Sequence, residues 1–153
     1  MVYLLVVGLT MLVLPLASIA VEFDMSNAPM AWLIGKWFVF WSVGARLFLA
    51  GVRQYVQPAF TSRDIMGIES PEVYGLVREL GGANIASGVL GLASIAMPNF
   101  VLPTAIGAGI FLAVAGVEHV RTAHRGRHET IAMISDFFVA AVLIGFALGT
   151  FFF

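Results

Sequence analysis

Residues 130–153 read TIAMISDFFVAAVLIGFALGTFFF, an apolar run interrupted by one charged residue, Asp136. A transmembrane helix needs about 20 consecutive, mostly apolar residues, so this run is long enough to cross a bilayer. An ionisable group in hydrocarbon costs at least ~2.5–3.5 kcal/mol, so Asp136 is expected to face a protein interior. Polar residues are embedded in apolar segments in the same way elsewhere in the chain, and this pattern decides the fold class.

The overall composition is typical of a membrane protein. Of the 153 residues, 60% are hydrophobic and 11% are charged, whereas soluble domains contain about 25% charged residues. The formal net charge of −1 lacks the basic excess that nucleic-acid binding requires. No cysteine is present, which removes disulfides, thiolate nucleophiles and cysteine metal ligands.

The apolar segments predict an all-α fold, a polytopic transmembrane helical bundle forming a single domain over residues 1–153. The expected helices cover residues 2–21, 30–55, 71–97, 100–122 and 130–153. Residues 57–70 are expected to form the longest loop, and Ser70 followed by Pro71 is typical of a helix start. A signal peptide is the alternative for the first segment, but no Lys or Arg precedes its apolar run.

The basic residues of the loops predict the orientation of the bundle. Arg53 and Arg63 lie in or directly beside one expected loop, and Arg121, Arg125 and Arg127 lie in or directly beside another. The two remaining loops contain neither Lys nor Arg. The excess of basic residues in cytoplasmic loops therefore places the amino terminus inside and the carboxyl terminus outside, in what we expect to be a prokaryotic cytoplasmic membrane.

Several polar residues are expected at a similar depth, close to the cytoplasmic side. With a rise of 1.5 Å per residue, the helix geometry places all of them in the inner half of the membrane. They form the candidate site for a proton, an ion or a small polar head group: Arg46, Glu79, Asn84, Glu118, His119 and Asp136.

The chemistry of this cluster leaves two interpretations open. Carboxylates with an imidazole suit a metal ion, and Glu79, Glu118 and His119 are the candidate ligands; neighbouring residues of one helix point about 100° apart, however, which argues against Glu118 and His119 sharing a metal. Alternatively, Arg46 neutralises Glu79 or Asp136 in a purely structural ion-pair network that Asn84 completes.

Small residues recur at a spacing of four on three of the expected helices. They are Ala83, Ser87 and Gly91; Ala105, Gly109 and Ala113; and Ala141, Gly145 and Gly149. Such stripes let helix backbones approach closely. Packing within the protein is the default expectation, and a homo-oligomer through the last helix is the alternative; membrane lipid is the other expected partner.

From Ala45 onward the chain resembles the DoxX-like small membrane proteins and a related domain-of-unknown-function family of bacteria and archaea. The matching features are the run from Ala45 to Gly51, the run from Arg78 to Asn84, and the Glu118-His119 pair. The resemblance implies a four-helix core with an added amino-terminal helix. It also implies a link to quinone-linked sulfur oxidation or redox homeostasis, although the lack of cysteine departs from thiol-linked redox roles.

These observations lead to hypotheses from different classes. The first is a small membrane protein that binds or translocates a proton, an ion or a small amphiphile through the polar cluster. The second is an accessory or anchoring subunit of a quinone-linked membrane oxidoreductase, and the third is an intramembrane enzyme that uses Glu and His. A metal ion and a quinone are the cofactors that such a site would suit.

Overall fold

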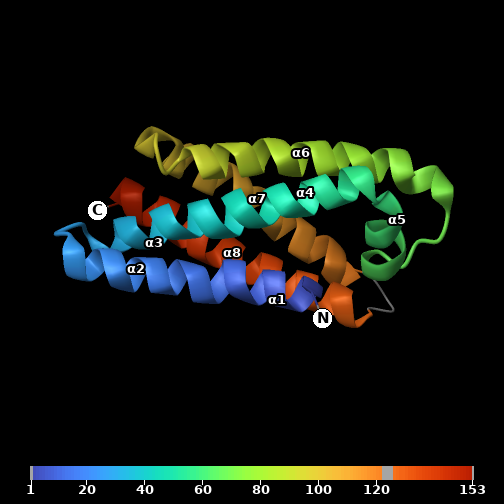
Figure 1. The fold of residues 1–153 in the computed structure, drawn as a ribbon, viewed down its shortest axis with the longest axis horizontal. Helices are drawn as coiled ribbons and strands as arrows, with labels where there is room; N and C mark the ends of the chain where they lie inside the picture. Colours follow the sequence, from blue (N-terminus) through green and yellow to red (C-terminus); the bar gives the residue numbers. More distant parts are fainter. Residues whose placement is uncertain (1, 122–125, 153) are drawn as a thin grey trace.

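The computed structural model describes residues 2–121 and 126–152, and the helices of this part form five long rods that lie side by side (Figure 1). The first rod consists of α1 (Val2–Gly8), the π-helical segment η1 (Leu9–Val13) and α2 (Leu14–Met25). The second consists of α3 (Met30–Phe38), the π-helical segment η2 (Val39–Ala45) and α4 (Arg46–Val56).

The other rods are α6 (Tyr74–Ala93), α7 (Val101–Arg121) and α8 (Arg127–Phe152). Shorter elements connect them: α5 (Pro58–Phe60), the π-helical η3 (Thr61–Ile65), and the 3-10 helices η4 (Pro71–Val73) and η5 (Pro98–Phe100). The described residues contain no strand. The expected all-α helical bundle is confirmed.

Within the described residues, four stretches are helices long and apolar enough to cross a membrane. They are Tyr3–Met25, Met30–Val56, Pro98–Arg121 and Arg127–Phe152. Helix α6 has 20 residues but is not among these four, since Arg78 and Glu79 interrupt its apolar sequence. The protein is therefore a helical membrane protein, whereas a fifth crossing by α6 stays a prediction.

Several expected boundaries are wrong. The third helix ends at Ala93 rather than at residue 97, and the last helix starts at Arg127 rather than at residue 130. The first helix continues to Met25 rather than ending at residue 21, and Glu22 inside it accepts hydrogen bonds of 2.7 Å from Lys36 Nζ and Trp37 Nε1. The expected loop 57–70 is helical from Pro58 to Ile65, because Pro58 is buried at a helix start that suits its fixed φ. Arg125 and the expected end of the fourth helix at residue 122 lie outside the described residues.

Helix α6 packs directly on the second rod through glycine. A Cβ atom on Gly91 would lie 2.5 Å from the backbone nitrogen of Gly44, and one on Gly81 would lie 2.9 Å from the carbonyl oxygen of Gly51. Side chains at these positions would separate the two helices. The close approach places the polar residues of α4 beside those of α6.

The small-residue stripes divide between inner and outer faces. On α7, Gly109 faces Ile144 of α8, where an added Cβ would lie 3.1 Å from that side chain. On α8, Gly145 and Gly149 have open space where a Cβ would be. Contacts between α7 and α8 therefore use the α7 stripe, whereas assembly through the α8 stripe stays a prediction.

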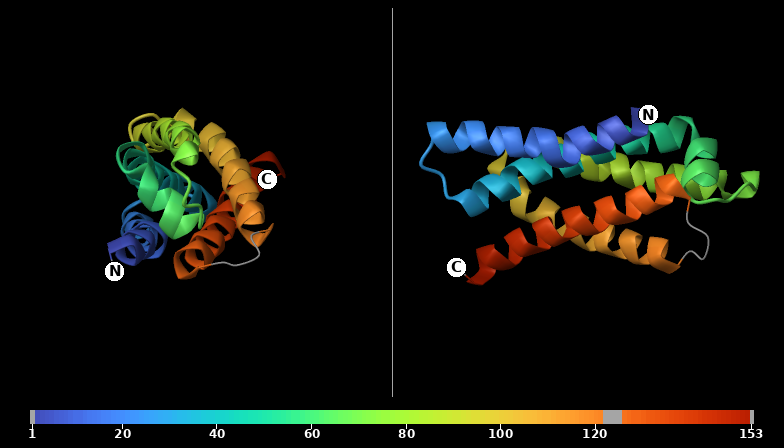
Figure 2. Two further views of the ribbon diagram at one scale, coloured as in Figure 1. Left: turned by 90° about the vertical axis from the view of Figure 1, so that its right-hand side faces the viewer. Right: turned by 90° about the horizontal axis from the view of Figure 1, so that it is seen from below.

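Figure 2 shows the helices arranged around the long axis of the bundle, with the two ends of the chain toward opposite ends of it. An apolar core lies between the helices. Leu33, Val43, Leu112, Val139 and Leu143 fill this core and are at most 1% exposed. Large apolar side chains also cover the outside, among them Leu16, Val21, Ile110 and Leu148. An apolar outer surface suits contact with membrane lipid.

The first two rods are joined at their π-helical segments. The hydroxyl of Ser42 in η2 donates a hydrogen bond of 3.1 Å to the carbonyl oxygen of Thr10 in η1. A π-helical turn adds a residue to the α-helical count and so rotates the following side chains by about 100° around the helix. Arg46 follows η2 directly, so this segment sets the direction in which its side chain points.

Candidate functional site

The centre of the site is a buried ion pair between α4 and α8. Arg46 Nη2 lies 2.6 Å from Asp136 Oδ1, and the two side chains are 10% and 7% exposed. The same Nη2 donates a second hydrogen bond, of 3.2 Å, to Ser135 Oγ. The expected partnership of Arg46 with Asp136 is confirmed. The alternative expected partner, Glu79, is exposed on α6.

His119, near the end of α7, lies between two carboxylates of α8. Its Nδ1 is 3.3 Å from Glu129 Oε1, and its Nε2 is 3.9 Å from Asp136 Oδ2. Glu129 is 3% exposed. A continuous line of polar groups therefore runs from Glu129 through His119 and Asp136 to Arg46.

Asn84 extends the polar region onto α6. Its Nδ2 donates a hydrogen bond of 2.8 Å to Gln54 Oε1 of α4, across the interface that the glycines make close. Its Oδ1 is buried and has no hydrogen-bond partner within the described structure. Asn84 thus presents an unused acceptor in the interior.

Arg53 lies two turns beyond Arg46 on α4. Its guanidinium carbon is 3.5 Å from the centre of the Phe60 ring of α5, a cation–π arrangement. Among the described residues, its buried Nε has no hydrogen-bond partner, and the same is true of Arg46 Nη1. Two arginine donors on one face of α4 are therefore available to a ligand.

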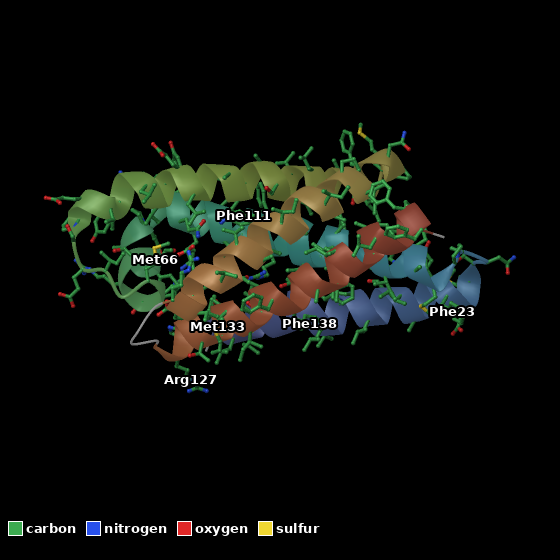
Figure 3. All side chains as sticks on the ribbon, turned by 180° about the vertical axis from the view of Figure 1, so that it is seen from behind. Phe23, Met66, Phe111, Arg127, Met133 and Phe138 are labelled. Atoms are coloured by element: carbon green, nitrogen blue, oxygen red, sulfur yellow. The ribbon has the colours of Figure 1, made fainter. Side chains whose placement is uncertain are left out.

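Most of these polar groups, although not Glu129 or Ser135, line one cavity of about 450 Å³ at the α5 end of the bundle. Figure 3 shows Met66 and Phe111 on this part of the molecule, with side-chain nitrogen atoms between them. Most of the wall is apolar and includes Val6, Leu47 and Leu112. Its polar members are Tyr3, Arg46, Arg53, Gln54, Thr61, Asn84, Glu118, His119 and Asp136.

Five of the six predicted site residues are thus brought to one cavity, and Glu79 is not. Glu79 is exposed on α6 and does not line the cavity, because Asn84 is on the face of this helix that packs on α4, and Glu79 is not on that face. Glu118 is at the cavity but is 61% exposed, and it accepts a hydrogen bond of 2.6 Å from Arg121.

The expected metal ligands Glu79, Glu118 and His119 do not form a metal centre. Within residues 2–121 and 126–152, no group of three His, Asp or Glu side chains is placed to hold a metal ion. Glu79 is on the exposed face of α6, and the carboxylate of Glu118 is directed to Arg121. His119 instead faces the two carboxylates of α8.

Glu129 is not among the predicted site residues, because the last helix was expected to begin just after it, at residue 130. The available signal was helical spacing: Glu129 precedes Asp136 by seven residues, so both lie on one face of α8 together with Ala132. All three are buried. Arg53 was missed for a similar reason, because its charge was counted only as a loop signal for topology.

The comparisons with known proteins identify an uncharacterised group. No curated protein and no solved structure matches the chain. The resemblance to the DoxX-like proteins stays a prediction, whereas a family whose members have no known function matches nearly the whole chain. With the model of that family, DUF6790, matching residues 1–152, the protein belongs to this family of unknown function.

Proposed function

We propose that this membrane protein binds a small amphiphile in the cavity at the α5 end of the bundle. One observation carries the proposal: within the described structure, Arg46 Nη1, Arg53 Nε and Asn84 Oδ1 are the buried side-chain atoms without hydrogen-bond partners, and all three residues line this cavity. A buried polar group without a partner costs about 1–3 kcal/mol. A polar head group that pairs with them removes this cost.

The shape and lining of the cavity support an amphiphile rather than a bare ion. Its volume of about 450 Å³ lies within the range of roughly 300–1,000 Å³ typical of small-molecule pockets. Apolar side chains make most of the wall and would contact the hydrocarbon part of a ligand. The arginines and Asn84 would receive its head.

Proton transfer coupled to this binding is a second candidate. It is supported by the position of His119, whose ring nitrogens face Glu129 and Asp136. An imidazole between two carboxylates can take a proton from one side and give it to the other. The accessory-subunit hypothesis rests on the DoxX-like resemblance alone, and the enzyme hypothesis lacks a metal centre in the described residues.

The orientation proposed from the sequence is an inside amino terminus. Arg53, Arg63, Arg121 and Arg127 all belong to the elements at the α5 end. Basic residues gather on the cytoplasmic side of membrane proteins. The cavity would accordingly lie in the cytoplasmic half of the membrane.

Binding can be tested by native mass spectrometry of the protein released from detergent micelles containing hexadecanol. Ala115→Leu adds a side chain at a residue that lines the cavity, and Ala83→Leu adds the same atoms on the exposed face of α6. We expect the parent and Ala83→Leu to retain one hexadecanol and Ala115→Leu to lose it. Equal retention by the two variants would refute the cavity as the binding site.

A further inference from the structure

We infer that the ligand is a single-chain amphiphile with one negative charge, and that it enters the cavity sideways from the bilayer. The inference rests on the proposed amphiphile-binding function. It adds the charge of the head group, the number of chains and the route of entry. Each of these follows from a different feature of the cavity.

The cavity opens on the side of the bundle between α7 and the packed pair of α4 and α6. Leu49 of α4 and Val114 of α7 both line the cavity, yet they are 51% and 57% exposed. They therefore form the rim of an opening. Figures 2 and 3 show how it arises: α7 starts beside the end of α6 and inclines away from it toward Arg121.

The end of the bundle nearest the cavity is covered by protein. Phe60 of α5, Thr61 and Ile65 of η3, and Met66 all line the cavity, and Thr61 is 4% exposed. The short helical elements α5 and η3, where a loop was expected, thus lie across this end of the bundle. An apolar side opening admits a molecule that is already dissolved in lipid, whereas a water-soluble ion would have to cross hydrocarbon.

The charges around the cavity favour a negative head group. Arg46 is paired with Asp136, and the exposed Glu118 is paired with Arg121. His119 faces Glu129, which does not line the cavity. Arg53 is thus the cation at this cavity for which the described residues provide no ion pair.

The guanidinium of Arg53 is also positioned by its contacts so that it can bind a head group. Stacking on the Phe60 ring restricts the guanidinium, and its Nε is buried without a partner. A carboxylate accepts strong, charge-assisted hydrogen bonds from such a group. A cavity of about 450 Å³ holds one such head with one chain, rather than a two-chain lipid.

The charge can be tested with palmitate, hexadecanol and hexadecylamine, which share one chain length. We expect the parent protein in native mass spectrometry to retain palmitate about tenfold better than hexadecanol, since a hydrogen bond to a charged group is worth about that factor. Hexadecylamine should not be retained. Arg53→Met should reduce palmitate to the level of hexadecanol, and Arg53→Lys should restore part of the difference.

The route can be tested by the rate at which palmitate exchanges between vesicles and the protein in nanodiscs. Val114→Trp narrows the opening, while Ile110→Trp places the same ring one turn away, at an exposed residue that does not line the cavity. We expect slower exchange for Val114→Trp alone. Equal exchange rates for both variants would overturn the sideways route.

The outcomes separate this inference from the function on which it rests. Retention of hexadecanol at the level of palmitate, with no effect of Arg53→Met, overturns the negative charge but leaves amphiphile binding in place. Retention of none of the three amphiphiles overturns both proposals. If the parent and Ala115→Leu retain palmitate equally, palmitate binds at the surface of the protein. This result would overturn the cavity as the binding site.

Discussion

Removal of both members of the Arg46–Asp136 pair should cost less than the sum of the two single removals. The pair is shielded, with side chains 10% and 7% exposed. In Asp136→Asn, the guanidinium keeps its charge, since arginine is not deprotonated in proteins, and it retains Ser135 as its charge-neutral partner. Breaking a buried pair in this way typically costs about 3–5 kcal/mol.

Arg46→Met should be less costly, about 2–3 kcal/mol, because the carboxylate that it leaves behind keeps other polar neighbours. Asp136 also has His119 Nε2 at 3.9 Å as a second neighbour. The double variant removes both charges. Its cost should therefore fall below the sum of the two single costs by about 1–3 kcal/mol, the usual range for coupled neighbours.

The assay is equilibrium unfolding in mixed micelles with increasing dodecyl sulfate, followed by circular dichroism. Glu79→Gln is the matched control, because Glu79 is exposed and exposed substitutions usually change stability by less than about 0.5 kcal/mol. The reasoning is refuted if Arg46→Met is as stable as the parent. If the stability losses of the two substitutions simply add, Arg46 and Asp136 are not energetically coupled, and this would also contradict the reasoning.

Two further predictions concern packing and orientation. Gly91→Ala should destabilise the protein by about 1–3 kcal/mol, because its Cβ would meet the backbone of Gly44 at 2.5 Å; Gly82→Ala, with nothing within 4 Å of an added Cβ, should be neutral or slightly stabilising in the same unfolding assay. Reporter fusions after Gly126 and after Asn27 should report the cytoplasm and the exterior respectively, and identical locations would contradict the orientation.

The sequence alone predicted the class of fold and the depth of the site. A backbone in hydrocarbon must satisfy its own hydrogen bonds, so a long apolar run has few alternatives to a helix. The fixed rise per residue then converts position in the chain into depth. For this reason Arg46, Asn84, His119 and Asp136 could be placed at one level before their contacts were known.

The helix boundaries that were predicted wrongly depend on contacts between residues that are far apart in the sequence. Glu22 looked like a loop residue, but it is part of a helix in which Lys36 and Trp37 of the next rod bond to it. Residues 58–65 looked like an irregular loop, but they form helical turns that cover the cavity. The sequence around each residue does not indicate which distant residues will contact it.

Only the tertiary structure decided which polar residues at that depth face one another. The direction of a side chain around its helix depends on every turn before it, and a π-helical segment such as η2 shifts that direction by about 100° without an evident sequence signal. Helix packing likewise left Glu79 on the surface and buried Glu129 beside His119. Depth is a property of one helix, whereas a cavity and its unpaired polar atoms arise from the packing of several.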